Sequence, residues 1–280
     1  MTDKITEQSS DVLTLHSRLA APIADSSPLK KVLLFAELSM IAYLPETEAR
    51  RAASSIGLQE CTFLDRDGSQ AYLFNDADDC VVACRGTEPN EWNDIKADAN
   101  AATALAETIG RVHRGFKREV DDLWPLMEQA LIDKKKMLWF TGHSLGGAMA
   151  TICAGRCFLS HIPSTPHALF TYGSPRVGNK RYINYCRLDH ARWVNNNDIV
   201  THVPPAWMGY RHTGQEMYLN AYGKIRRMTG WQRTKDRWRG FNMGLRTGSF
   251  DHFSDHSIKR YIEYIHDAML EEKNQAQLES

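Results

Sequence analysis

The residues around Ser144 have the types and spacing that a nucleophilic serine needs. Residues 142–146 read Gly-His-Ser-Leu-Gly, the pattern G-x-S-x-G, between an apolar run at 137–141 and a helix-like stretch that begins at Leu145. On a sharp turn from a strand into a helix, the serine hydroxyl stands clear of the backbone, and the two glycines leave the space that such a turn requires. The first N–H groups of the helix then face any oxyanion that forms beside the serine. The pattern and its context together predict a nucleophile at Ser144.

A serine hydroxyl needs a base to take its proton, and the base needs an acid to orient it. On a strand–turn–helix scaffold of this kind the order along the chain is Ser, then Asp or Glu, then His. Asp198 follows a short apolar strand, which places it on the rim where open α/β sheets build their sites, and His256 opens the predicted last helix. The less favoured alternatives are Asp189, which precedes its strand instead of following it, and His252, which precedes the helical register.

The elements that position these side chains alternate between strand and helix. Short apolar runs predict buried strands at 80–84, 137–142, 168–173 and 191–196. Apolar residues at helical spacing predict helices at 28–44, 116–134, 145–160, 178–188 and 256–270. Asp67-Gly68 predicts a hairpin, because this dipeptide tolerates positive φ. The alternation is typical of an α/β fold with a mostly parallel central sheet flanked by helices.

We interpret the chain as one domain between two polar ends. Residues 1–28 form a polar N-terminal leader with a short helix near 12–19, residues 29–270 form the domain, and residues 271–280 form a polar C-terminal tail. No internal repeat and no low-complexity linker divides the sequence.

Composition excludes several classes of protein. The 34 basic and 34 acidic residues balance, which argues against a nucleic-acid-binding protein with a uniformly basic surface. No apolar stretch is long enough to predict a transmembrane segment. The N-terminus lacks the apolar core of a signal peptide, so the sequence predicts a cytoplasmic protein, with a leaderless export route or a mature form as the alternatives.

The six cysteines are predicted to be thiols, because they are sparse and no export signal accompanies them. Cys153 and Cys157 lie four residues apart on a predicted helix. No second Cys or His pair has a matching spacing, so two small buried residues are expected there and no metal site.

Taken together, these residues resemble the class 3 lipase family, whose members have the α/β-hydrolase fold and are related to triacylglycerol lipases of filamentous fungi. The resemblance spans about residues 30–270. Six blocks in the same order carry it, namely 81–87, 112–116, 142–147, 170–179, 195–205 and 255–261.

The resemblance implies a role for each matching residue. Ser144 is the nucleophile, Asp198 the acid and His256 the base of a catalytic triad. Thr87 and Leu145 form the oxyanion hole, Thr87 through its backbone N–H and hydroxyl and Leu145 through its backbone N–H. Two donors are needed because they must converge on the charge that develops on the carbonyl oxygen.

The resemblance also implies a lid after the oxyanion residue, in residues 88–111. Trp92 and Ile95, three residues apart, would form its apolar face, although the segment is acidic and rich in alanine. Residues 222–247 depart from the family pattern, with eight basic side chains among two tryptophans and a phenylalanine. Such a segment could bind an anionic membrane surface. The alternative is a surface loop whose tryptophans pack on the core.

The expected activity is cofactor-independent hydrolysis of lipid esters, either triacylglycerols or partial glycerides, through an acyl-enzyme. Two other interpretations stay open at this point. One is a phospholipase A1 or a non-lipid esterase such as a feruloyl esterase. The other is a non-catalytic binding protein on the same fold.

Overall fold

The computed structural model describes residues 13–86, 102–107, 109–226 and 254–278. At its centre is an eight-stranded sheet with the strand order β1-β2-β3-β6-β7-β9-β11-β12. The five strands from β3 to β11 in this order are parallel, and β1, β2 and β12 pair antiparallel at the two sides. The strand bounds are β1 Glu60–Arg66, β2 Ser69–Asn75, β3 Asp79–Cys84, β6 Met137–His143, β7 Pro166–Tyr172, β9 His190–Asn195, β11 Gln215–Leu219 and β12 Ile225–Arg226.

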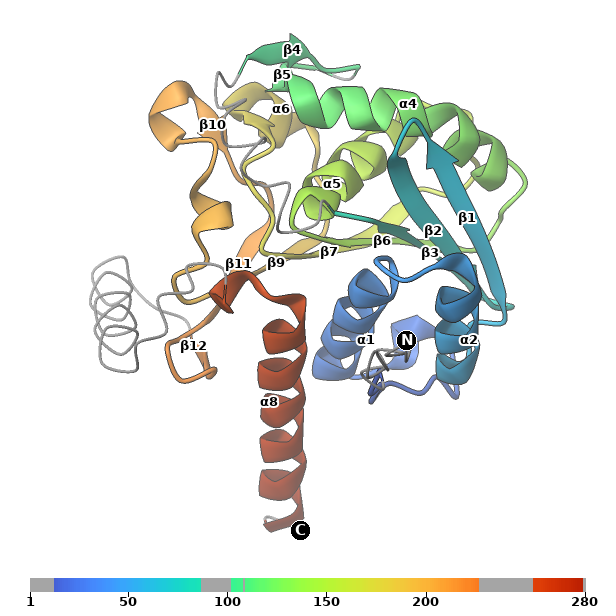
Figure 1. Cartoon of the computed structure of the whole chain (residues 1–280), viewed down its shortest axis with the longest axis vertical. Helices are drawn as coiled ribbons and strands as arrows, with labels where there is room; N and C mark the ends of the chain where they lie inside the picture. Colours follow the sequence, from blue (N-terminus) through green and yellow to red (C-terminus); the bar gives the residue numbers. More distant parts are fainter. Residues whose placement is uncertain (1–12, 87–101, 108, 227–253, 279–280) are drawn as a thin grey trace, which may run out of the picture.

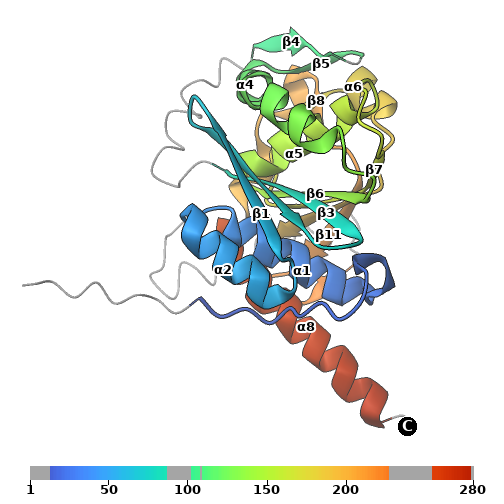
Figure 2. The ribbon, with the colours of Figure 1, turned by 90° about the vertical axis from the view of Figure 1, so that its right-hand side faces the viewer.

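Helices cover both faces of this sheet (Figures 1 and 2). One hydrophobic core lies between the sheet and α1 (Pro28–Ile41), α2 (Glu46–Ile56) and α8 (Ile258–Leu278). A second core lies between the opposite face and α4 (Arg114–Leu131) and α5 (Leu145–Cys157). Buried strands such as β3 and β6 are apolar at almost every position because both of their faces are covered.

A smaller sheet joins segments that come from different parts of the chain. Its order is β10-β8-β5-β4, with bounds β4 Thr103–Leu105, β5 Arg111–His113, β8 Gly178–Asn179 and β10 Tyr210–Arg211. The short helix α6 (Lys180–Tyr185) continues directly from β8. Figure 1 shows β4, β5, β10 and α6 gathered at one end of the molecule. None of these short strands has enough residues to show a period in the sequence.

The described part of the predicted leader packs on the first core. Glu37, fully buried in α1, accepts hydrogen bonds from the backbone N–H groups of His16 (2.6 Å) and Ser17 (3.0 Å). Asp79 accepts another from the N–H of Ile23 at 2.7 Å. The helix predicted near 12–19 is wrong over 13–19, which is not helical. Because these backbone donors are already bonded to buried carboxylates, the segment needs no helix to satisfy them.

Helix α8 starts and ends later than the sequence indicated. His256 lies in a short 3-10 helix, η5 (Ser254–His256), two residues before α8, so it does not itself open the long helix. At its other end α8 continues to Leu278, through most of the predicted polar tail 271–280. The domain bounds 1–28, 29–270 and 271–280 stay a prediction.

All six cysteines are free, and all are buried, including Cys153 and Cys157, for which burial was expected. Among the described residues, no helix has the length and apolar composition needed to cross a membrane.

Candidate active site

Ser144 lies on a tight turn between β6 and α5. Its backbone angles are φ 60° and ψ −131°, a conformation that costs a residue with a Cβ about 1–3 kcal/mol. The buried strand before it and the thirteen-residue helix after it hold this strained residue in place. The turn directs the serine side chain away from the strand, and Leu145 becomes the first residue of α5.

The glycines on either side of Ser144 are required by close backbone contacts. A Cβ at Gly142 would collide with the backbone of Gly146, and a Cβ at Gly146 would collide with the carbonyl oxygen of Cys84 at the end of β3. The turn can therefore pass between β6, α5 and β3 only without side chains at these two positions.

A continuous chain of hydrogen bonds joins the three predicted triad residues. His256 Nε2 lies 2.8 Å from Ser144 Oγ, and His256 Nδ1 lies 2.9 Å from both carboxylate oxygens of Asp198. The carboxylate accepts the Nδ1–H, which leaves the lone pair of Nε2 free to accept the serine proton. Ser144, Asp198 and His256 are all buried, so water does not compete for these hydrogen bonds.

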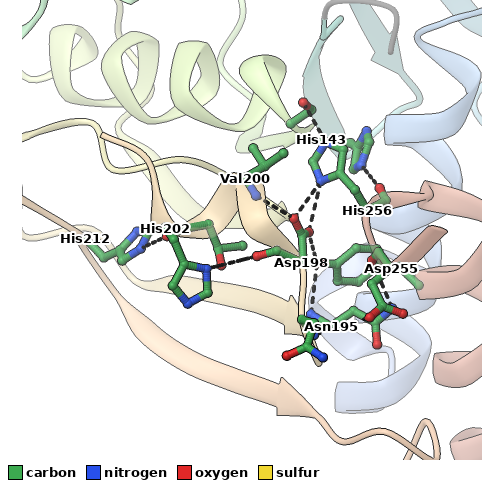
Figure 3. Close-up of polar contacts among 12 residues, drawn as sticks. His143, Asn195, Asp198, Val200, His202, His212, Asp255 and His256 are labelled. Carbon is green, nitrogen blue, oxygen red and sulfur yellow. Dashed lines mark hydrogen bonds and ion pairs between the residues drawn. The ribbon is translucent and has the colours of Figure 1, made fainter. Parts of the chain in front are cut away.

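Two further donors hold the Asp198 carboxylate. Its Oδ1 accepts a hydrogen bond from the N–H of Val200 at 3.0 Å, and its Oδ2 accepts one from the hydroxyl of Tyr261 at 2.7 Å. Figure 3 shows Asp198 between Val200 and His256. Burial and the neighbouring Asp198 raise the pKa of Tyr261 well above its usual value, so Tyr261 stays protonated and can donate. These contacts compensate for burying a negative charge.

Hydrogen bonds of Thr201 and His212 hold the turn after Asp198. Asp198 caps the short 3-10 helix η3 (Ile199–His202), in which the Thr201 hydroxyl donates to the Asp198 carbonyl at 2.8 Å. His212 Nε2 in turn donates to the Thr201 carbonyl at 2.8 Å. Burial lowers the pKa of His212 well below its usual value, so His212 is neutral. These contacts give His212 a structural role in holding the turn.

The turn that carries His256 is tied to the same loop. Asp255 Oδ2 accepts a hydrogen bond from the Asn196 side chain at 3.1 Å, and the Asn195 side chain donates to the Asp255 carbonyl at 2.9 Å. The base and the acid are therefore connected by their neighbours as well as by their own side chains (Figure 3). Burial raises the pKa of the Asp255 carboxyl.

His143 connects the nucleophile strand to the base. Its Nε2 donates to the backbone carbonyl of His256 at 2.7 Å, and its Nδ1 lies 3.0 Å from the hydroxyl of Tyr43. Burial, followed by the neighbouring His256, lowers the pKa of His143 well below its usual value. A neutral His143 has one N–H and one acceptor nitrogen, so Tyr43 must be the donor to Nδ1.

The structure brings together Ser144, Asp198, His256 and Leu145 from the predicted site. Leu145 is buried at the start of α5, where its N–H belongs to the first turn and has no partner within the helix. Thr87, the lid residues Trp92 and Ile95, and His252 lie outside the described residues, as does most of the basic segment 222–247. Asp189 immediately precedes β9, at the amino edge of the parallel strands, whereas Ser144 follows the carboxyl end of β6.

The sequence did not identify Tyr261, Tyr43, His143 or Asp255 as parts of the site. Tyr261 lies in the predicted helix 256–270, and its hydroxyl contact with Asp198 depends on the packing of α8. His143 lies inside the G-x-S-x-G pattern, and Asp255 lies beside the predicted base. These positions next to the triad are the sequence features that could have identified the two residues as parts of the site. In the described part of the chain, no group of three or more His, Cys, Asp or Glu residues could hold a metal ion.

Comparison with known proteins finds similarity to lipases, both in a family model and in individual sequences. The family model described as "Lipase (class 3)" matches residues 81–208. A lipase of Rhizomucor miehei is 34% identical over 119 residues, which are 39% of this chain and 33% of that protein. The secreted mono- and diacylglycerol lipase 1 of Fusarium solani is 43% identical over 132 residues, which are 46% of this chain and 32% of that protein. The chain thus covers about a third of the length of these two relatives.

Among solved structures, the Rhizomucor miehei triacylglyceride lipase superposes with a TM-score of 0.59. Its sequence is 21% identical, and the match covers 69% of this chain and 82% of that one. The likeness shows the fold, which is the α/β-hydrolase fold predicted from the sequence.

The prediction of a cytoplasmic location is wrong in view of these relatives. The Fusarium solani protein is a secreted lipase by name, and so is a Penicillium cyclopium relative, the secreted mono- and diacylglycerol lipase A. The prediction rested only on the composition of the N-terminal residues, which does not determine where a protein is delivered.

Proposed function

We propose that this chain is a member of the class 3 lipase family and a serine hydrolase that cleaves the carboxylic ester bonds of lipids. Ser144 is the nucleophile, His256 the general base and acid, and Asp198 the residue that orients His256. The observation that carries the proposal is the buried hydrogen-bonded chain from Ser144 Oγ through both nitrogens of His256 to Asp198.

In the first half of the reaction, Ser144 Oγ attacks the ester carbonyl carbon while its proton moves to His256 Nε2. The imidazolium that forms is stabilised by the Asp198 carboxylate at Nδ1. The carbonyl oxygen becomes negatively charged and accepts hydrogen bonds from the N–H of Leu145 and from Thr87. As the tetrahedral intermediate collapses, His256 gives its Nε2 proton to the leaving alcohol, and the acyl group stays on Ser144.

In the second half, water attacks the acyl group and His256 Nε2 takes a proton from that water. Collapse of the second intermediate returns the proton to Ser144 Oγ and releases the fatty acid. The chain, the ester and water supply every proton and electron pair, so the proposed reaction has no cofactor.

The proposed substrates are acylglycerols. The family and the two lipase relatives support this class of substrate, since one relative is named for monoacyl- and diacylglycerols.

Product analysis with emulsified lipids tests the proposal. Purified protein is incubated with triacylglycerol, diacylglycerol, phospholipid and a short soluble ester, and the products are separated. We expect free fatty acid from the acylglycerols, and a loss of at least about 10³-fold in kcat for Ser144→Ala. The matched control is Ser39→Ala. Ser39 is also buried, but its hydroxyl bonds Thr141 (2.8 Å) and the Phe35 carbonyl (2.8 Å), so this variant should keep its activity.

Each other outcome contradicts part of the proposal. Lysophospholipid as the main product would assign a phospholipase, and turnover of the soluble ester alone would assign an esterase. Full activity of Ser144→Ala would exclude the nucleophile, and no turnover of any ester would indicate a binding protein.

A further inference from the structure

Four exposed basic side chains lie on the small sheet and on the helix that continues from it. Arg111 is on β5, Lys180 and Arg181 are on α6, and Arg211 is on β10. β8 lies between β10 and β5, and α6 begins where β8 ends. Adjacent strands are about 4.8 Å apart, so the four positions fall within a few strand spacings at the end of the molecule where Figure 1 shows β10, α6 and β5.

None of these four side chains makes an ion pair in the part of the chain that the structure describes. Two carboxylates that are close to Arg111 and Arg211 in the sequence have other partners. Glu107 lies 2.6 Å from Lys117, and Glu216 lies 2.9 Å from Arg192. The positive charge of the four residues is therefore not neutralised within the described fold.

Two large apolar side chains are exposed beside these charges. Trp207 is 83% exposed and Leu105 is 70% exposed. Trp207 lies in the short 3-10 helix η4 (Ala206–Met208), which is held to β10 because Arg211 donates to the Ala206 carbonyl at 2.6 Å. Leu105 is the β4 residue paired with Arg111. A tryptophan this exposed gains little from folding, since almost none of its apolar surface is removed from water.

The segments that carry Trp207, Lys180 and Arg181 are reached from the carboxyl ends of β9 and β7, the edge at which Ser144 follows β6. The segment that carries Trp207 follows β9 and Asp198, and β8 follows β7. Arg176, in the loop after β7, donates to the Pro204 carbonyl at 3.0 Å just before η4. The two loops that leave the carboxyl ends of β7 and β9 are thereby joined, and they support η4, β8 and α6.

We propose that Arg111, Lys180, Arg181, Arg211, Leu105 and Trp207 form a rim patch that docks onto an anionic lipid surface. The inference rests on the proposed function, because a lipid hydrolase gains from binding the surface that holds its substrate. Unpaired basic side chains are attracted to anionic headgroups, and an exposed tryptophan is most stable at the boundary between headgroups and acyl chains. The rim patch offers both, and its η4 and α6 are reached by loops that leave the edge of the sheet where Ser144 lies.

Vesicle binding tests the rim patch independently of hydrolysis. The full chain with Ser144→Ala is mixed with phosphatidylglycerol vesicles or with phosphatidylcholine vesicles, and the bound fraction is measured by sedimentation. We expect stronger binding to the anionic vesicles. Since each basic residue near an anionic surface contributes about fivefold to binding, the added pair Lys180→Glu and Arg181→Glu should weaken it at least about tenfold. Trp207→Ala should weaken binding to both kinds of vesicle.

The matched control reverses two exposed lysines outside the rim patch, Lys30→Glu in α1 and Lys135→Glu between α4 and β6. This pair makes the same change in net charge and should leave vesicle binding unchanged. Equal effects of the two pairs, equal binding to both kinds of vesicle, or retention of the protein on a nucleic acid without vesicle binding would overturn the rim patch.

Failure of the rim patch can be told apart from failure of the proposed function. Vesicle binding by a protein that hydrolyses no ester would leave the rim patch standing and remove the activity. Ser144-dependent hydrolysis with no preference for anionic vesicles would support the activity and contradict the rim patch.

Discussion

Asp198 and Arg181 lie in segments that follow two neighbouring parallel strands, β9 and β7, but their charges have opposite surroundings. Asp198 is buried and accepts hydrogen bonds from His256, Val200 and Tyr261. Arg181 is exposed and has no ion pair in the described fold. A buried charge needs several fixed partners to offset its desolvation, and those partners also fix its geometry. An exposed charge costs nothing to leave unpaired and remains available to a partner outside the chain.

The largest expected effect is a loss of kcat when Asp198 is replaced by Asn, a side chain of the same shape without the negative charge. In Asp198→Asn, the amide NH₂ can donate to His256 Nδ1, which would place the imidazole proton on Nε2. That nitrogen could then no longer accept the serine proton, so we expect kcat to fall about 10⁴-fold with a soluble ester. The matched control is Asp189→Asn, the alternative acid at the amino edge of β9, and its kcat should stay close to that of the unmodified chain. Comparable losses in the two variants would contradict the assignment of Asp198.

Acid should destabilise the folded chain through a buried histidine, His190. Burial, followed by Arg192, lowers the pKa of His190 from 6.5 to about 3. Between these values the unfolded chain binds a proton that the folded chain does not, so the free energy of unfolding falls as the pH falls. From pH 8 to pH 5 the loss from this one residue is about 2 kcal/mol. Below about pH 3 both states are protonated and the contribution is constant.

Urea unfolding at several pH values measures this loss. His190→Gln should flatten the pH dependence of the free energy of unfolding between pH 8 and pH 5, whatever it does to stability at pH 8. His161, which is exposed, provides the control, and His161→Gln should keep the full slope. An unchanged slope in His190→Gln would show that His190 has the same pKa in the folded chain as in the unfolded chain, which would contradict the prediction. His143 and His212, whose pKa values are also lowered by burial, account for the slope that remains.

A smaller effect is expected from one hydroxyl beside the acid. Tyr261→Phe removes the donor to Asp198 Oδ2 and leaves the buried N–H of Asn195, which bonds the same hydroxyl at 2.9 Å, without that acceptor. We expect the free energy of unfolding to fall by about 1–3 kcal/mol. We also expect kcat to fall about tenfold, which corresponds to about 1.4 kcal/mol of lost orientation of Asp198. Tyr264→Phe, on the same helix, is the control. A loss of stability with unchanged kcat would limit Tyr261 to a structural role.

The parts of the site that the sequence predicted are those whose constraints are local. Gly142 and Gly146 flank Ser144 because the backbone of Gly146 and of Cys84 leaves no room for a side chain, and this requirement is visible as a five-residue pattern. Ser144 and Asp198 each follow the carboxyl end of a parallel strand, β6 and β9, and His256 precedes the last helix, so their order along the chain could be predicted. The apolar runs of β3, β6, β7 and β9 are visible because both faces of these strands are buried.

The parts that the sequence did not predict depend on contacts between distant segments. Tyr261 and Asp198 are 63 residues apart, and Tyr43 and His143 are 100 residues apart. No local pattern links such pairs until the helices have packed. The end of α8 was missed for a different reason. Residues 271–278 are exposed and polar, so they have no apolar period, although Glu, Lys, Gln and Ala all favour helix.

The smallest expected effect is the effect of salt, which should differ between the exposed rim patch and the buried triad. Raising the ionic strength from about 0.1 M to about 1 M shortens the Debye length from about 10 Å to about 3 Å. Attraction between exposed charges such as Lys180 and Arg181 and an anionic surface should then weaken, and binding of the Ser144→Ala chain to phosphatidylglycerol vesicles should fall. The hydrogen bonds of Asp198 are buried and are screened much less, so the turnover of a soluble ester by the unmodified chain should change less than about twofold. Equal salt dependence of vesicle binding and ester turnover would mean that the rim patch and the triad do not act separately.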